Sequence, residues 1–163
     1  MTSGRTSVVF ELNGRRVATE VFPHELLSDV LRSNLGHTDV KVGCGEGVCG
    51  TCTVLLDDEP VSACLVFGCQ VDGRRVVTVR GLSMAEGELH ALQESFLDYG
   101  AAQCGFCTPG MIVTAYWYLQ RNPTPSRAEI RAALSGNLCR CTGYSAIIDA
   151  VDAYARAAVR EVT

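Results

Sequence analysis

The sequence has no run of basic residues, no long apolar stretch and no repeated segment, and each absence excludes a class of protein. Lys and Arg number 14 against 18 Asp and Glu, for a formal charge of −4, so the basic surface of a nucleic-acid-binding protein is missing. The longest apolar stretch, Met111 to Leu119, is about half of the roughly 18 residues that a membrane span needs. We therefore expect a protein that binds neither nucleic acid nor membrane.

The first residues also lack a secretory signal. Met1 to Arg5 leads directly into a strand-like segment, with neither an apolar region nor a twin-arginine pair. A cytoplasmic location is the expectation that follows. Thiols are kept reduced in the cytoplasm, so the nine cysteines point to metal binding and not to a disulfide framework.

Eight of these cysteines fall into two sets of four. The first cysteine set has the spacing C-x4-C-x2-C-x11-C and consists of Cys44, Cys49, Cys52 and Cys64. The second cysteine set has the spacing C-x2-C-x31-C-x-C and consists of Cys104, Cys107, Cys139 and Cys141. The first three cysteines have the spacing of plant-type 2Fe-2S ferredoxins. We predict that each set holds one 2Fe-2S cluster and that the chain passes electrons between them.

Two other metal sites also use cysteine ligands. Structural zinc is the main alternative for the second set, because paired C-x2-C elements are common zinc ligands; the glycine-rich first set is poor zinc-finger spacing. A Rieske centre needs two histidine ligands, yet His24, His37 and His90 all lie more than five residues from any cysteine. The ninth cysteine, Cys69, is expected to be a small apolar residue, or else to replace Cys64 as fourth ligand of the first cluster.

The first 80 or so residues have the pattern of a sheet with one helix. Asn13-Gly14 is a strong hairpin signal, and the glycine-rich segment from Val42 to Thr51 predicts a loop that can wrap a cluster. Strands are predicted over residues 7–12, 15–21, 53–56, 61–66 and 76–79, and a helix over residues 26–35 with Gly36 as its C-cap.

The character of the chain changes around residues 81–87, and every later segment has helical periodicity. Helices are predicted over residues 88–99, from Thr108 (N-cap) and Pro109 to about Gln120, from the capping box Ser126-x-x-Glu129 to near Gly136, and over residues 145–159. We therefore predict an α+β chain with two domains, residues 1–82 and residues 83–163.

Three motifs around the cysteines carry a family resemblance. They are Val42-Gly-Cys-Gly-Glu-Gly-Val-Cys-Gly-Thr-Cys-Thr53, Gln103-Cys-Gly-Phe-Cys-Thr-Pro-Gly-Met111 and Gly136-Asn-Leu-Cys-Arg-Cys-Thr-Gly-Tyr144. With these motifs the chain resembles the small iron–sulfur subunit of the molybdenum hydroxylases, the group that includes xanthine dehydrogenase, aerobic carbon monoxide dehydrogenase and aldehyde oxidase. The resemblance covers nearly the whole chain.

The resemblance implies a plant-type ferredoxin-like (β-grasp) first domain and an all-α four-helix bundle as the second. It also implies partners: a large subunit with a molybdenum–pterin (molybdopterin-type) cofactor and a medium subunit with FAD, in a hetero-oligomer that can be a dimer of heterotrimers. Electrons would pass from molybdenum through the helical-domain cluster and then the ferredoxin-like cluster to FAD or another acceptor. The chain would carry no catalytic residue itself. A free-standing two-cluster ferredoxin is the alternative.

The resemblance also implies roles for residues beside the clusters. Gln103 and Cys141 match positions that contact the pterin in the family. Arg140, between two ligands, is expected either to tune the cluster potential or to be an exposed surface residue. The aromatic residues Tyr116, Trp117 and Tyr118 are expected to form bundle core or a subunit contact.

Overall fold

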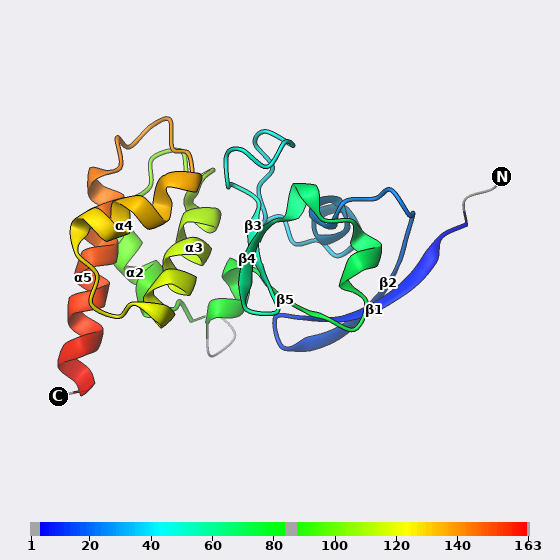
Figure 1. The fold of residues 1–163 in the computed structure, drawn as a ribbon, viewed down its shortest axis with the longest axis horizontal. Coiled ribbons are helices and arrows are strands. Elements are labelled where there is room, and N and C mark those ends of the chain that lie inside the picture. Colours follow the sequence, from blue (N-terminus) through cyan, green and yellow to red (C-terminus); the bar gives the residue numbers. More distant parts are fainter. Residues whose placement is uncertain (1–3, 84–87, 163) are drawn as a thin grey trace.

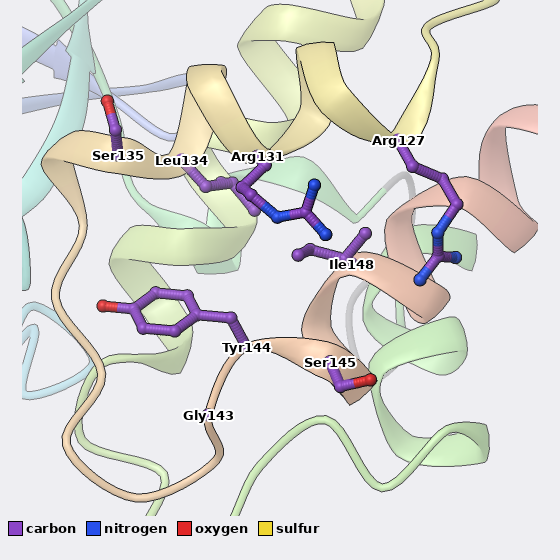
Figure 2. Close-up of a pocket in the computed structure, with 8 residues that line it drawn as sticks. All are labelled: Arg127, Arg131, Leu134, Ser135, Gly143, Tyr144, Ser145 and Ile148. Carbon is purple, nitrogen blue, oxygen red and sulfur yellow. The ribbon is translucent and has the colours of Figure 1, made fainter.

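The computed structural model describes residues 4–83 and 88–162, the side chains of residues 159–162 excepted. The sheet lies in the first half of the chain, and the four longest helices lie in the second half, side by side with it (Figure 1). The chain is therefore a sheet-containing unit followed by a helical one, as predicted. Within the described part of the chain, none of the helices combines the length and apolarity needed to cross a membrane.

Five strands form one mixed sheet in the order β2-β1-β5-β3-β4. Their bounds are Thr6–Leu12 (β1), Arg15–Val21 (β2), Thr53–Leu56 (β3), Glu59–Ser62 (β4) and Arg75–Val77 (β5). β1 runs parallel to β5, and the other pairs are antiparallel. The predicted first hairpin is confirmed: Asn13 and Gly14 have φ angles of 51° and 77°, as a two-residue type I′ turn requires.

The fourth strand was placed wrongly by the sequence pattern. The prediction was residues 61–66, but β4 is Glu59–Ser62, and Ala63–Leu65 forms a short 3-10 helix (η2). Pro60 sits inside β4, which is tolerated because β4 is an edge strand with no neighbour for a missing N–H on its outer side. The turn consists of Asp57 and Asp58 alone, with φ angles of 50° and 67°.

Two other elements differ from their predicted form. The helix expected over residues 26–35 begins as α1 (Leu27–Asp29) and continues as a π-helical turn, η1 (Val30–Asn34). There the Leu35 N–H donates to the Val30 carbonyl at 3.1 Å. The strand predicted to reach residue 79 ends at Val77, and Val79–Leu82 forms a 3-10 helix (η4).

The second half contains helices α2 (Ala91–Asp98), α3 (Thr108–Arg121), α4 (Arg127–Ala133) and α5 (Ser145–Val162), with a 3-10 turn, η5 (Leu134–Gly136), after α4. The predicted capping box is confirmed, because the Ser126 hydroxyl accepts the Glu129 N–H at 3.3 Å and the Glu129 carboxylate accepts the Ser126 N–H at 2.8 Å. The N-cap of α3 is Cys107 and not the predicted Thr108, so the helix begins directly after a cysteine.

Two hydrophobic cores result from these elements. One lies between α1, η1 and the sheet and includes Phe10 and Leu31. The other lies among the helices and includes Phe96, Met111 and Ile147. Helix α3 also packs against β3 and β4 (Figure 1), so one helix belongs to the helical core and touches the sheet.

Candidate iron–sulfur sites

The loop before β3 turns its backbone N–H groups toward the first cysteine set. The Cys44 sulfur accepts N–H groups from Glu46 at 3.3 Å and from Cys49 at 3.4 Å. These hydrogen bonds, with Glu46 the largest contributor, lower the pKa of Cys44 to about 6. The loop therefore stabilises a thiolate at Cys44, the form in which cysteine binds metal.

The other two cysteines of the first set lie at the base of the loop. Cys52 and Cys64 are buried, and their thiols interact directly. Burial, followed by smaller interactions with Cys64 and Cys49, raises the pKa of Cys52 to about 11. The structure thus brings all four predicted residues of the first set together, with Cys44 beside Cys49 and Cys52 beside Cys64.

The second cysteine set is formed by two loops of the helical half. One loop precedes α3, and the other joins η5 to α5. The sulfurs of Cys104 and Cys141 lie 3.6 Å apart. Cys107 interacts with Cys139, and burial, the larger cause, raises the pKa of the Cys107 thiol to about 12.

The two sets therefore share a pairwise arrangement of sulfurs. Among residues 4–83 and 88–162, no three His, Cys, Asp or Glu side chains converge as ligands of a single metal ion. Structural zinc needs four ligands around one ion, whereas a 2Fe-2S cluster takes two thiolates on each of two irons. The donor sets fit the two-iron group better.

Cys69 lies apart from both sets. Its side chain packs against the first core, and its thiol contacts the Pro23 carbonyl at 3.8 Å. It is Cys64, and not Cys69, that lies beside Cys52. The position of Cys69 agrees with the expectation of a small apolar residue.

The remaining predicted residues divide between surface and core. Gln103, Arg140 and Cys141 are exposed, and the contact between Cys104 and Cys141 brings the two loops that carry them together. Tyr116 packs against the helical core, edge-on to His90 at 5.3 Å between ring centroids. The ring of Trp117 stacks under the Arg121 guanidinium, and Tyr118 accepts a hydrogen bond from Asn122.

The structure also contains a link between the two cysteine loops that the sequence analysis missed. The Leu138 N–H donates to the Cys49 carbonyl at 2.9 Å, and the Asn137 side-chain amide donates to the Gly50 carbonyl at 2.9 Å. Asn137 is only 4% exposed. An uncharged polar side chain inside a cysteine motif was the one available signal for its role.

Each cysteine set is bordered by exposed apolar side chains. Val48 and Leu65 flank the first set, and Phe106 and Leu138 flank the second. All four are neighbours in sequence of a cysteine of these sets. Exposed large apolar residues gathered around a site are typical of a protein–protein contact.

Comparison with known proteins gives the same assignment. The model of a 2Fe-2S iron-sulfur cluster binding domain matches residues 10–83, and that of a second 2Fe-2S binding domain matches residues 78–152. The chain is 48% identical to the nicotine 6-hydroxylase small subunit of Paenarthrobacter nicotinovorans over 91% of this chain and 89% of that one. It is 46% identical to the nicotinate dehydrogenase small FeS subunit of Eubacterium barkeri, over 90% and 93% of the two chains.

A solved structure has the same fold. The chain matches quinoline 2-oxidoreductase from Pseudomonas putida 86 with a TM-score of 0.92 and 48% identity, covering 97% of this chain and 98% of that one. The two matched domains mean that the chain holds two 2Fe-2S clusters and transfers electrons. It belongs to the family of small iron–sulfur subunits of the molybdenum hydroxylases.

Proposed function

We propose that this chain carries electrons from a molybdenum–pterin site in a large partner subunit to FAD in a medium partner subunit. A bound 2Fe-2S cluster supplies a one-electron store. The observation that carries the proposal is the convergence of two cysteine sets whose loops are joined by the Leu138–Cys49 hydrogen bond. The ligands would be Cys44, Cys49, Cys52 and Cys64 for one cluster, and Cys104, Cys107, Cys139 and Cys141 for the other.

The surroundings of the sulfurs support this ligand assignment. Thiols must lose their protons to bind metal, and hydrogen bonds from Glu46 and Cys49 favour the thiolate at Cys44. Burial raises the pKa of Cys139, but hydrogen bonds with Thr142, Cys141 and Cys107 together outweigh that effect and lower the pKa overall. One sulfur in each set is therefore prepared for ligation by its own loop.

Two surfaces would receive the partners. The exposed residues Gln103 and Cys141 would contact the pterin cofactor, and the apolar Phe106 and Leu138 beside them would pack against the large subunit. Val48 and Leu65 would cover the first cluster against the FAD subunit. Relatives named as small subunits support an assembly of large, medium and small chains, and a dimer of such heterotrimers is the arrangement that we propose.

The presence of two separate cores supports two domains, with α2, α3, α4 and α5 as a four-helix bundle in the second. We place the boundary at residues 82 and 83, beside Leu82, which already packs in the helical core. We place the assembly in the cytoplasm, where thiols stay reduced.

Metal content and paramagnetic resonance test the proposal. The purified complex should contain about four irons per chain and show two signals on reduction, as two two-iron clusters require. Cys49→Ser and Cys139→Ser should each abolish or change a different signal, and Cys69→Ser, the matched control, should leave both as they are. Migration as a lone monomer free of molybdenum would contradict the assembly, and loss of a signal in Cys69→Ser would contradict the ligand assignment.

A further inference from the structure

In each cysteine set, one threonine hydroxyl contacts one cysteine sulfur. The Thr51 hydroxyl oxygen lies 3.2 Å from the Cys49 sulfur. The Thr142 hydroxyl oxygen lies 3.1 Å from the Cys139 sulfur. The same type of contact therefore occurs once at each of the two sites.

Ligation determines which atom donates the hydrogen bond, and backbone N–H groups orient the hydroxyl for it. The Gly43 N–H donates to the Thr51 hydroxyl oxygen at 2.9 Å, and the Tyr144 N–H donates to the Thr142 hydroxyl oxygen at 3.2 Å. Each hydroxyl oxygen thus accepts a backbone N–H with one lone pair, and its own proton remains available for the cysteine sulfur. Since a ligating cysteine has lost its proton, the hydroxyl is the donor and the sulfur the acceptor.

The local backbone is built to keep the first of these contacts. A Cβ atom at Gly43 would lie 3.1 Å from the Thr51 hydroxyl oxygen and 3.2 Å from the Cys49 sulfur, which is tighter than ordinary van der Waals contact. Glycine leaves room for the pair. Thr51 is 6% exposed, so the protein, and not bulk water, provides the partners of its hydroxyl.

The second contact is reinforced by the same residue. The Thr142 N–H donates to the Cys139 sulfur at 3.4 Å, so Thr142 directs both its N–H and its hydroxyl to one sulfur. A variant without the hydroxyl would keep the N–H donor. The contribution of the hydroxyl can therefore be measured separately.

We propose that Thr51 and Thr142 tune the reduction potentials of the two clusters, each acting on its own cluster. Hydrogen bonds to cluster sulfurs are among the main determinants of potential. Reduction adds negative charge that the ligand sulfurs share, and a hydrogen bond to a charged acceptor is the stronger kind. Each hydroxyl therefore stabilises the reduced form and raises the potential. The inference rests on the proposed ligation by Cys49 and Cys139.

The positions of the two threonines make their effects on electron flow opposite. Thr51 contacts the sulfur of Cys49, whose carbonyl accepts the Leu138 N–H, and Thr142 contacts the sulfur of Cys139, the residue that follows Leu138. Loss of the Thr51 hydroxyl would lower the potential of the first cluster and so hold the electron back on the second. Loss of the Thr142 hydroxyl would drive the electron toward the first cluster.

A redox titration followed by paramagnetic resonance on the intact complex tests the proposal. Thr51→Val should shift the midpoint potential of the first cluster downward and leave the second unchanged, and Thr142→Val should do the reverse. The two signals are assigned with Cys49→Ser and Cys139→Ser, and in each variant the unaltered cluster is the internal control. Thr51→Ser and Thr142→Ser keep the hydroxyl and should restore most of the wild-type midpoint.

Unchanged midpoint potentials in both valine variants would overturn the proposal. Equal shifts in the serine and valine variants would also overturn it, because they would show that packing, and not the hydroxyl hydrogen bond, sets the potential. If a valine variant loses its cluster, wild-type protein exchanged into D2O gives a second measurement. Double resonance on each reduced cluster should then detect, besides the exchangeable deuterons of the backbone N–D donors, one further deuteron that the serine variant retains, and the absence of this further deuteron overturns the proposal. Lack of both resonance signals in the wild type would instead refute the ligand assignment.

Discussion

The backbone N–H of Leu138 donates to the carbonyl oxygen of Cys49 at 2.9 Å, although 89 positions separate the two residues. The side chain of the preceding residue, Asn137, donates in parallel to the Gly50 carbonyl at 2.9 Å. Two hydrogen bonds of different kinds therefore hold the loops of the two cysteine sets against each other. This contact is the basis of the first prediction.

Replacing Asn137 by alanine should destabilise the protein. The substitution removes one of three donors to the buried Gly50 carbonyl, which keeps the Thr53 N–H and the Thr53 hydroxyl. Loss of one such hydrogen bond costs about 0.5–1.5 kcal/mol. Chemical denaturation followed by circular dichroism measures the change in unfolding free energy. Asn137→Asp, which has the same shape but no N–H to donate, should also destabilise, and Ser135→Ala on the exposed end of η5 is the control. A stable Asn137→Asp variant would contradict the assigned role of the amide.

Gly110→Ala should separate α3 from the first cysteine loop. A Cβ atom at this position would overlap the Gly50 carbonyl oxygen and lie 3.1 Å from the Thr51 carbonyl oxygen. Overpacking against backbone atoms that cannot rotate away costs about 1–3 kcal/mol. Gly136→Ala is the matched control, because nothing lies within 4 Å of a Cβ atom there. Equal thermal midpoints for the two variants would show that α3 does not pack this closely.

Glu59→Gln should have little effect, although it breaks another contact between the two halves. Glu59 of β4 pairs with Arg121 of α3, but the two side chains are 59% and 44% exposed. Exposed ion pairs contribute about 0–1 kcal/mol. We expect Glu59→Gln to lower the free energy of unfolding by less than Asn137→Ala does. The effect of Glu59→Gln should become smaller at high salt, because salt screens the ion pair. A larger loss than in Asn137→Ala would reverse this ranking.

His90 should make the stability of α2 depend on pH. Its Nδ1 atom accepts the Leu92 N–H at 3.1 Å, and burial lowers its pKa against a smaller opposing effect of Glu94. The pKa of His90 in the folded protein lies below the unfolded value of about 6.5. The contribution of His90 to the free energy of unfolding is therefore complete above about pH 6.5 and is lost as the pH falls through the folded pKa.

The matched variant for this prediction is His90→Asn, which keeps a side-chain oxygen for the cap and does not titrate in this range. Thermal midpoints of the two proteins should diverge between pH 7 and pH 5, with the wild type losing more. The other groups near the ring, Gln93, Glu94, Tyr116 and Tyr154, are common to both proteins. A difference that stays constant over this range would mean that protonation of His90 does not affect the fold.

Local patterns predicted most of the elements because their causes are local. The turn at Asn13 and Gly14 and the capping box at Ser126 each depend on residues within four positions. The predicted strand began at residue 61 because residues 57–60 have the composition of a turn, and only the position of β4 at the sheet edge makes Pro60 acceptable within the strand. The position of a strand within its sheet is set by long-range pairing, which a local pattern does not contain.

The same distinction applies to the candidate site. Spacing alone grouped the eight cysteines, because cluster ligands must come from short loops with flexible backbone. It could not find Asn137 or the hydroxyl contacts of Thr51 and Thr142, since these depend on how two loops meet after folding. The role of each of these three residues comes from its contacts in the folded chain and not from the local sequence.

The link from Leu138 to Cys49 also affects how the protein is made. Residues 44–52 leave the ribosome before residues 137 and 138 are synthesised, so the Leu138 and Asn137 donors to this loop do not yet exist at that stage. A chain truncated before Asn137 would lack both of these hydrogen bonds, together with Cys139 and Cys141 of the second set.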